Sequence, residues 1–164
     1  MGEHQEPGQP VGYMERTRLY YRALGYETDY LWSTFDDVPF TKLKQPLSES
    51  RIALITTASP SDLSNRDAAG RKIVWSGKVD PPPEKFVTDV AWDRDPTHTD
   101  DRESFLPINA ASALASDGVF AGLTEHFVGA PTVYSQAVTM DVHAPEILAK
   151  LRADGADAAI LSAL

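Results

Sequence analysis

The run RIALITTA at residues 51–58 constrains the fold of this chain more than any other stretch of the sequence. Ile52 through Ile55 are all apolar, and they follow the polar residues SESR at 48–51. Because successive side chains of a strand point to opposite faces, an unbroken apolar run of this length predicts a strand that is buried on both faces. Such strands are typical of parallel sheets covered by helices, so the run predicts the central strand of an α/β fold.

Further helix and strand signals follow this run. One helix is predicted from Pro107 to Gly118 and another from Pro145 to Gly155, since proline suits the first turn of a helix and glycine its end. Alternating residues from Phe86 to Trp92 predict one strand, and the apolar residues 158–164 predict another. We therefore expect residues 51–164 to form a three-layer α/β domain with a mainly parallel, Rossmann- or flavodoxin-like sheet.

Residues 1–50 have a different character. Aromatic and aliphatic residues recur at helical spacing between Tyr13 and Leu24, and Gly25 suits the end of that helix. The following residues, 26–46, form an irregular arm in which we see no chemistry. We expect the helix and the arm to pack on the α/β domain, so that the chain forms a single domain overall.

Charge and cysteine content exclude several classes of function. The 164 residues carry a formal net charge of −9, which argues against a nucleic-acid partner because phosphate binding needs clustered lysine and arginine. No apolar run approaches the ~18 residues of a membrane span, and the polar start MGEHQEPGQP does not resemble a signal peptide, so we expect a cytoplasmic protein without membrane contact. The sequence contains no cysteine, which excludes disulfides, thiolate zinc sites and cysteine nucleophiles within it.

The segment WDRDPTHTDDRESFLP at 92–107 is the predicted functional segment. It combines one histidine, five carboxylates and two arginines between a predicted strand and a predicted helix. The amides and dipole at a helix start favour an anion, and ligands of α/β sheets lie beyond the carboxyl ends of the strands. We expect catalytic roles for His98 and Asp101, where the imidazole of His98 could supply or accept a proton. We expect substrate-binding roles for Asp100 and Arg102, because an arginine can bind a carboxylate through two hydrogen bonds.

Hydroxyl groups elsewhere in the chain are expected to join this site. Thr56 and Thr57 stand at the carboxyl end of the central strand, although hydroxyls there can equally cap a turn. Tyr134 and Ser135 are further candidates for substrate binding, although a plain loop fits these residues as well. The glycines at 118, 122 and 129 do not have the spacing of a dinucleotide fingerprint, so no dinucleotide cofactor is predicted.

Three alternatives to this interpretation remain open. His98, Asp100 and Asp101 could be ligands of a metal-dependent hydrolase, although a second nearby histidine is missing and no metal is predicted. The sequence THTDD could be a capped and solvated loop. The whole chain could be a non-catalytic α/β binding or interaction module.

Four motifs give the chain a resemblance to a known family: YMERTRLYYRALGY at 13–26, WDRDPTHTDDRESFLP at 92–107, GAPTVYSQ at 129–136 and DGADAAILSAL at 154–164. Across nearly its whole length it resembles the selenoprotein B family of glycine, sarcosine, betaine and D-proline reductases, in particular the short stand-alone members. In that family the last strand is followed at once by the redox residue, which is selenocysteine or cysteine. This sequence stops where that residue is expected, as if the carboxyl-terminal part of the domain were missing.

The resemblance implies a selenol- or thiol-dependent reduction of a small substrate, with no cofactor other than selenocysteine in the full-length protein. It also implies a thiol or selenoprotein redox partner, and a homo-oligomer is compatible with it. A selenol at the amino end of a helix would be favoured in its anionic form by the helix amides and dipole. The 164 residues themselves, which lack any cysteine, are expected to be inactive.

We predict that the codon directly after Leu164 is UGA and that the reading frame continues beyond it. Residues 158–164 form an apolar strand with no terminating feature, and an unpaired apolar strand edge is costly in water. The nucleotide sequence downstream of Leu164 checks this prediction. A UAA or UAG codon at that position would instead favour the non-catalytic module.

Overall fold

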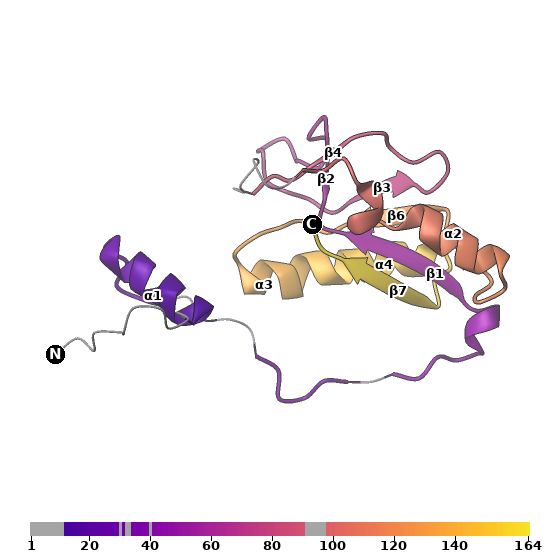
Figure 1. Cartoon of the computed structure of the whole chain (residues 1–164), viewed down its shortest axis with the longest axis horizontal. Coiled ribbons are helices and arrows are strands. Elements are labelled where there is room, and N and C mark those ends of the chain that lie inside the picture. Colours follow the sequence, from indigo (N-terminus) through magenta and orange to yellow (C-terminus); the bar gives the residue numbers. More distant parts are fainter. Residues whose placement is uncertain (1–11, 30, 32–33, 40, 91–97) are drawn as a thin grey trace. The chain divides into compact units, whose positions relative to one another are not determined.

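The structure is a computed structural model of the chain that describes residues 12–29, 31, 34–39, 41–90 and 98–164 (Figure 1). The chain divides into two compact units, Met1–Pro39 and Phe40–Leu164. Helix α1 (Tyr13–Ala23) belongs to the first unit and confirms the predicted amino-terminal helix, with Gly25 just beyond its end at a φ of 89°. None of the residues of α1 is buried. The division into a 1–50 arm and a 51–164 domain, and the packing of the arm on the domain, stay predictions.

The second unit is a mixed α/β structure built on a mostly parallel sheet (Figure 1). Its strands are β1 (Arg51–Thr56), β3 (Trp75–Lys78), β5 (Gly122–Leu123), β6 (His126–Gly129) and β7 (Ala158–Ser162). β1 pairs in parallel with β7 along one side, and with β5 and then β6 along the other. β3 pairs antiparallel with β6. The predictions of a central strand in the RIALITTA run and of a strand near the end of the sequence are therefore confirmed.

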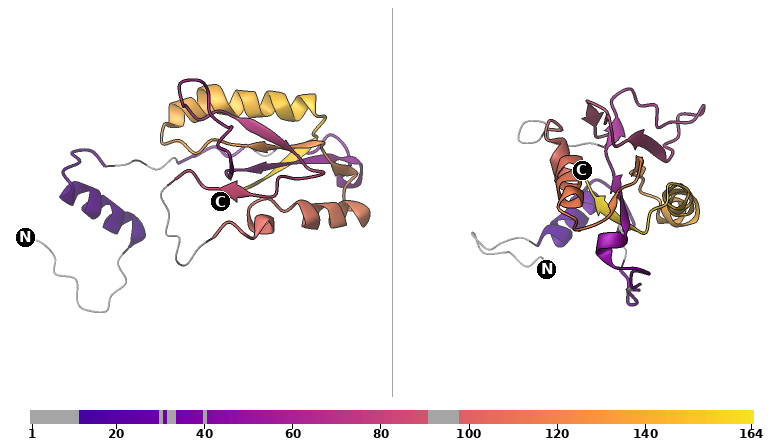
Figure 2. Two further views of the ribbon diagram at one scale, coloured as in Figure 1. Left: turned by 90° about the horizontal axis from the view of Figure 1, so that it is seen from above. Right: turned by 90° about the vertical axis from the view of Figure 1, so that its right-hand side faces the viewer.

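Both faces of β1 are covered, as its unbroken apolar run predicted. Ile52 and Leu54 belong to one buried cluster, which includes Ile108 of α2 (Ile108–Ser116). Ala53 and Ile55 belong to a second cluster, which includes Leu151 of α4 (Ala144–Ala153). Figure 2 shows α2 and α4 on opposite sides of the sheet. Among the described residues, no helix is both long enough and apolar enough to cross a membrane.

The predicted strand from Phe86 to Trp92 is wrong in extent. Its described part forms only β4 (Phe86–Val87), which pairs antiparallel with β2 (Ser59–Pro60) in a separate two-stranded sheet. Pro60 faces Phe86 and has no N–H to donate, so this ladder cannot extend as a regular strand pair would. Residues 91–97, including Trp92, lie outside the described residues.

The last helical region begins earlier than the predicted start at Pro145. It starts with α3 (Gln136–Val138), continues through the π-helical turn η3 (Thr139–His143), and reaches Ala153 as α4. Pro145 lies in the first turn of α4, directly after the π turn. Proline is tolerated in a first helical turn, so the helical region continues through it. Two 3₁₀ turns complete the helical elements described: η1 (Leu47–Glu49) and η2 (Arg102–Ser104).

A glycine makes the contact between β3 and β6 possible. Gly129 faces Trp75 across the two strands, and a Cβ atom added at Gly129 would overlap the indole ring of Trp75. That ring also stacks edge-on against the buried Phe127, with ring centroids 5.3 Å apart, and its Nε1 donates to the Ala58 carbonyl oxygen at 3.2 Å. The indole therefore lies across the end of β6 and reaches the loop that follows β1.

We predict that Gly129→Ala lowers the free energy of unfolding by about 1–3 kcal/mol, because the added methyl group overpacks a filled position. Urea unfolding followed by circular dichroism measures the loss. A double-mutant cycle with Trp75→Ala provides the control, since the cost of Gly129→Ala should disappear once the indole is gone. An equal cost in both backgrounds would mean that backbone conformation, and not the indole, requires glycine at this position.

Candidate functional site

The carboxyl edge of the parallel sheet is the candidate functional site. Thr56, the last residue of β1, faces Gly129 of β6 on one side and Ser162 of β7 on the other. Three parallel strands therefore end in one row. Because ligands of open α/β sheets lie beyond the carboxyl ends of the strands, the loops that leave this row are the ones to consider.

The two threonines at the end of β1 have separate structural tasks. Thr56 is buried, and its Oγ1 accepts a hydrogen bond from the Ala58 amide at 3.2 Å, which is the turn-capping role considered as its alternative. Thr57 Oγ1 accepts from the Leu164 amide at 2.9 Å. Thr57 thus joins the loop after β1 to the residues after β7. A substrate-binding role for either threonine stays a prediction.

The segment that begins at His98 is joined to the same region by Thr99. Its hydroxyl donates to the carbonyl oxygen of Phe86 at 3.0 Å, and Phe86 pairs with Pro60, which follows β1 closely. His98 and Asp100 remain largely exposed, with 67% and 91% of their side-chain surfaces open to solvent. The Asp100 amide donates to His98 Nδ1 at 3.3 Å, so the contact between the two residues is a local one.

Asp101 and Arg102 form hydrogen bonds to residues of their own loop and of the first turn of α2. The Asp101 side chain caps η2 by accepting from the Glu103 amide at 3.2 Å. Arg102 Nη2 donates at 3.0 Å both to Glu103 Oε1 and to Asn109 Oδ1. Catalysis by His98 and Asp101 and substrate binding by Asp100 and Arg102 stay predictions.

Glu103, which sequence reasoning did not single out, occupies the place predicted for an anion. Its carboxylate accepts hydrogen bonds from the amides of Asn109 and Ala110 at the start of α2, at 3.0 to 3.1 Å. Burial alone would raise the pKa of Glu103, but these amides and Arg102 outweigh it and hold the pKa below its usual value. An acidic residue shortly before a predicted helix start was the available signal for such a cap.

Tyr134 and Ser135 lie in the loop that follows β6. The Tyr134 side chain is exposed. Ser135 caps α3, because its Oγ accepts from the Val138 amide at 3.3 Å. The cap shows why a serine suits this position without any ligand, and a substrate-binding role for the two residues stays a prediction.

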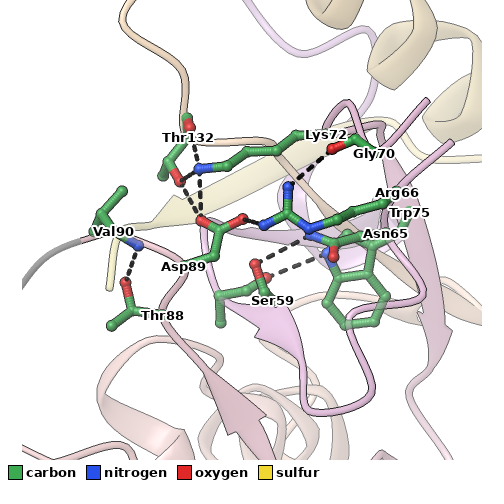
Figure 3. A network of polar contacts seen from close by, with 11 residues as sticks. Ser59, Asn65, Arg66, Gly70, Lys72, Trp75, Thr88, Asp89, Val90 and Thr132 are labelled. Atoms are coloured by element: carbon green, nitrogen blue, oxygen red, sulfur yellow. Dashed lines mark hydrogen bonds and ion pairs between the residues drawn. The ribbon is translucent and has the colours of Figure 1, made fainter.

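A buried carboxylate holds three loops of this edge together (Figure 3). Asp89, with only 5% of its side chain exposed, lies between Lys72 Nζ at 2.8 Å and Arg66 Nη2 at 3.1 Å. The Thr132 hydroxyl donates to Asp89 at 2.8 Å, and Lys72 also donates to the Thr132 carbonyl oxygen at 2.7 Å. The loops after β2, β4 and β6 are therefore tied to one another. Sequence reasoning missed this cluster, which joins residues 17 to 43 positions from Asp89.

The partners of Asp89 favour its ionised form. Burial on its own would raise the pKa of Asp89, but the hydrogen bonds from Lys72 and Thr132 and the nearby positive charges outweigh burial and lower the pKa. A carboxyl group whose pKa is lower in the folded state adds stability above its unfolded-state pKa. That stability is lost as the pH falls through the folded-state value.

We predict that Asp89→Asn lowers the free energy of unfolding at pH 7 by about 3 kcal/mol, because it leaves two partly buried cations without their counter-charge. As the pH falls below the ordinary aspartate pKa of about 3.9, the wild type should lose stability and the difference from the variant should shrink. Denaturant unfolding at several pH values measures both effects. Glu146→Gln, which removes a half-exposed pair with Lys150 at 3.8 Å, is the control and should cost at most about 0.5 kcal/mol. Equal losses for the two variants would contradict the assigned role of Asp89.

The hydrolase alternative used His98, Asp100 and Asp101 as metal ligands. The structure brings metal-ligating side chains together at a different place. Within the part of the chain that the structure describes, the histidine and carboxylate residues close enough to share one ion are Glu125, His126 and Asp154. They lie at the start of β6 and the end of α4, not among the loops of the carboxyl edge.

The comparison with known proteins finds a distant similarity. The chain is 26% identical over 144 residues to the glycine reductase complex component B subunit gamma of Peptoclostridium acidaminophilum. The alignment covers 84% of this chain and 33% of that protein, so the chain spans about a third of the length of the relative it matches. No family model and no solved structure matches the chain. The similarity supports the resemblance to the reductase family, but only loosely at this identity.

Proposed function

We propose that this chain provides part of a selenol- or thiol-dependent reductase that acts on a small substrate at the carboxyl edge of its sheet. The similarity to a glycine reductase component supports this reading, as do the four sequence motifs. The observation that carries the proposal is the bond from the Leu164 amide to Thr57 Oγ1, because it holds the end of β7 at the edge where β1 and β6 also end. The helices on the two faces of the sheet suit a three-layer, Rossmann- or flavodoxin-like arrangement, which forms part of the proposal.

The redox group has to be supplied from outside these 164 residues, since they include no cysteine. A selenolate or thiolate beside Thr57 would be near the loop that carries His98 and Arg102, because Leu164, which binds Thr57, packs on the same buried cluster as Phe105 at the end of that loop. His98 is exposed, so its imidazole could serve as the general acid or base for a bound substrate. Arg102 Nη2 already donates to Glu103 and Asn109, and its Nε is buried, so a substrate carboxylate would use Nη1.

Partners form a second part of the proposal. The relative is named as a subunit of a complex, and we propose that this chain likewise works with a protein partner that carries a reactive thiol or selenol. A homo-oligomer is compatible with this arrangement. The cytoplasmic location proposed from the sequence suits a reaction that depends on free thiols or selenols.

A non-catalytic interaction module is the second candidate, and one observation favours it. The charged groups of the carboxyl edge are largely satisfied by one another, as Arg102 by Glu103 and Lys72 by Asp89. Such a surface can hold its shape without a substrate. Turnover separates the two candidates, because only the reductase consumes a small molecule.

We predict that the product of the whole reading frame reduces at least one of glycine, sarcosine, betaine or D-proline in the presence of a dithiol. His98→Ala should lower kcat about 100-fold if the imidazole transfers a proton in the reaction. Glu146→Gln, on the surface of α4, is the matched control and should leave kcat unchanged. Turnover is measured by loss of the substrate, with circular dichroism to confirm that each variant is folded. A folded product that consumes none of the four compounds would move the assignment to the interaction module.

A further inference from the structure

The amino end of β6 places an imidazole between two carboxylates. His126 Nδ1 lies 3.5 Å from Asp154 Oδ1, and His126 Nε2 lies 3.9 Å from Glu125 Oε1. One potential ligand atom from each of the three residues lies within 4.8 Å of the other two. Asp154 stands 28 positions from His126 in sequence, so tertiary structure and not a local turn creates the group.

Backbone contacts hold this group in position. The His126 amide donates to Asp154 Oδ2 at 2.8 Å, which fixes that carboxylate and leaves its Oδ1 for another partner. The His126 carbonyl oxygen accepts from the Thr124 hydroxyl at 2.8 Å, and His126 faces Lys78 across the β3–β6 pair. A carboxylate oriented by a hydrogen bond to one oxygen is the usual arrangement around protein-bound metals.

The separations suit a metal ion. Bonds of Zn²⁺ to nitrogen or carboxylate oxygen are about 2.0–2.2 Å long, so two ligand atoms of a tetrahedral site are about 3.4 Å apart. Ligand atoms that lie up to 4.8 Å apart must therefore approach one another by at most about 1.4 Å to close around an ion. Glu125 can supply this movement, because 66% of its side chain is exposed and its ion pair with Lys78 is long, at 3.8 Å.

A cavity of about 330 Å³ adjoins the group and is lined in part by His126, Asp154, Lys150 and Ser76. It has room for several water molecules, which could complete the coordination of an ion. Lys150 lies 3.8 Å from Glu146, so its charge has a partner of its own. Imidazole nitrogen and carboxylate oxygen are both ligands that Zn²⁺ accepts, and an open side leaves a fourth position for water.

We propose that Glu125, His126 and Asp154 bind a divalent transition metal ion of the Zn²⁺ class, with water from the adjoining cavity completing its coordination. The site lies at the amino end of β6, whereas the proposed reductase chemistry lies at the carboxyl edge of the sheet. It therefore stands whether or not the chain belongs to a reductase. The ion would bind one nitrogen of the neutral imidazole, and the other ring nitrogen would keep its proton.

The test is titration of the purified, chelator-treated 164-residue chain with Zn²⁺ by isothermal titration calorimetry. We expect one ion per chain, and Co²⁺ in its place should give the visible absorption of a low-symmetry site. His126→Ala and Asp154→Asn should each raise Kd at least about tenfold. Glu125→Gln changes an exposed side chain that folding does not require, so its expected rise in Kd stays informative if another variant fails to fold.

His98→Ala is the matched control, because His98 also lies near a carboxylate, at 3.7 Å from Asp100, but in an exposed loop. Binding should survive this substitution unchanged. The proposal is overturned if the wild type binds no Zn²⁺ below millimolar concentration. It is overturned equally if His98→Ala weakens binding as much as Glu125→Gln does.

Discussion

The burial of β1 on both faces is the constraint on which the rest of this structure depends. All residues from Ile52 to Thr56 are buried, and consecutive side chains enter opposite clusters beneath α2 and α4. A strand of this kind has no solvent face on which a shift of register could be tolerated, so its neighbours are held in fixed positions. The row formed by Thr56, Gly129 and Ser162 follows from that pairing, and with it the place where the loops of the candidate site begin.

The parts of the fold that sequence could predict are those whose signal is local. The unbroken apolar run RIALITTA indicates a strand that is buried on both faces, and proline and glycine mark the ends of the helix predicted from Pro107 to Gly118. β5 and β6 carry no such signal, since GL and HFVG are short and separated by a break at Thr124 and Glu125. They become strands because the backbone of β1 pairs with both of them, and because Gly129 leaves room for Trp75 beside β6. This support comes from tertiary structure, which periodicity cannot reveal.

The same difference separates predicted from missed residues in the candidate site. A dense group of polar residues drew attention to the segment around His98, and the contact from Thr99 to Phe86 ties that segment to the strand pair next to the end of β1. The density of polar residues did not reveal which contacts the individual side chains make. Asp101 and Glu103 satisfy amides at the starts of η2 and α2, which is the ordinary use of acidic residues before helices. Asp89 had no local signal because its partners come from two other loops.

The pairing of charges limits what the carboxyl edge can bind. Arg66 and Lys72 share Asp89, and Arg102 is held by Glu103, so each of these three cations already faces a carboxylate of the protein. A substrate carrying only negative charge would compete with those carboxylates and would meet a chain of net charge −9. For the substrate proposed above, a small molecule that carries both an amine and a carboxylate would avoid this conflict, because its positive end would approach the exposed Asp100 and its negative end would meet Arg102 Nη1. Selection for such a molecule would then come from the balance of charge in one short loop, and not from a strongly positive pocket.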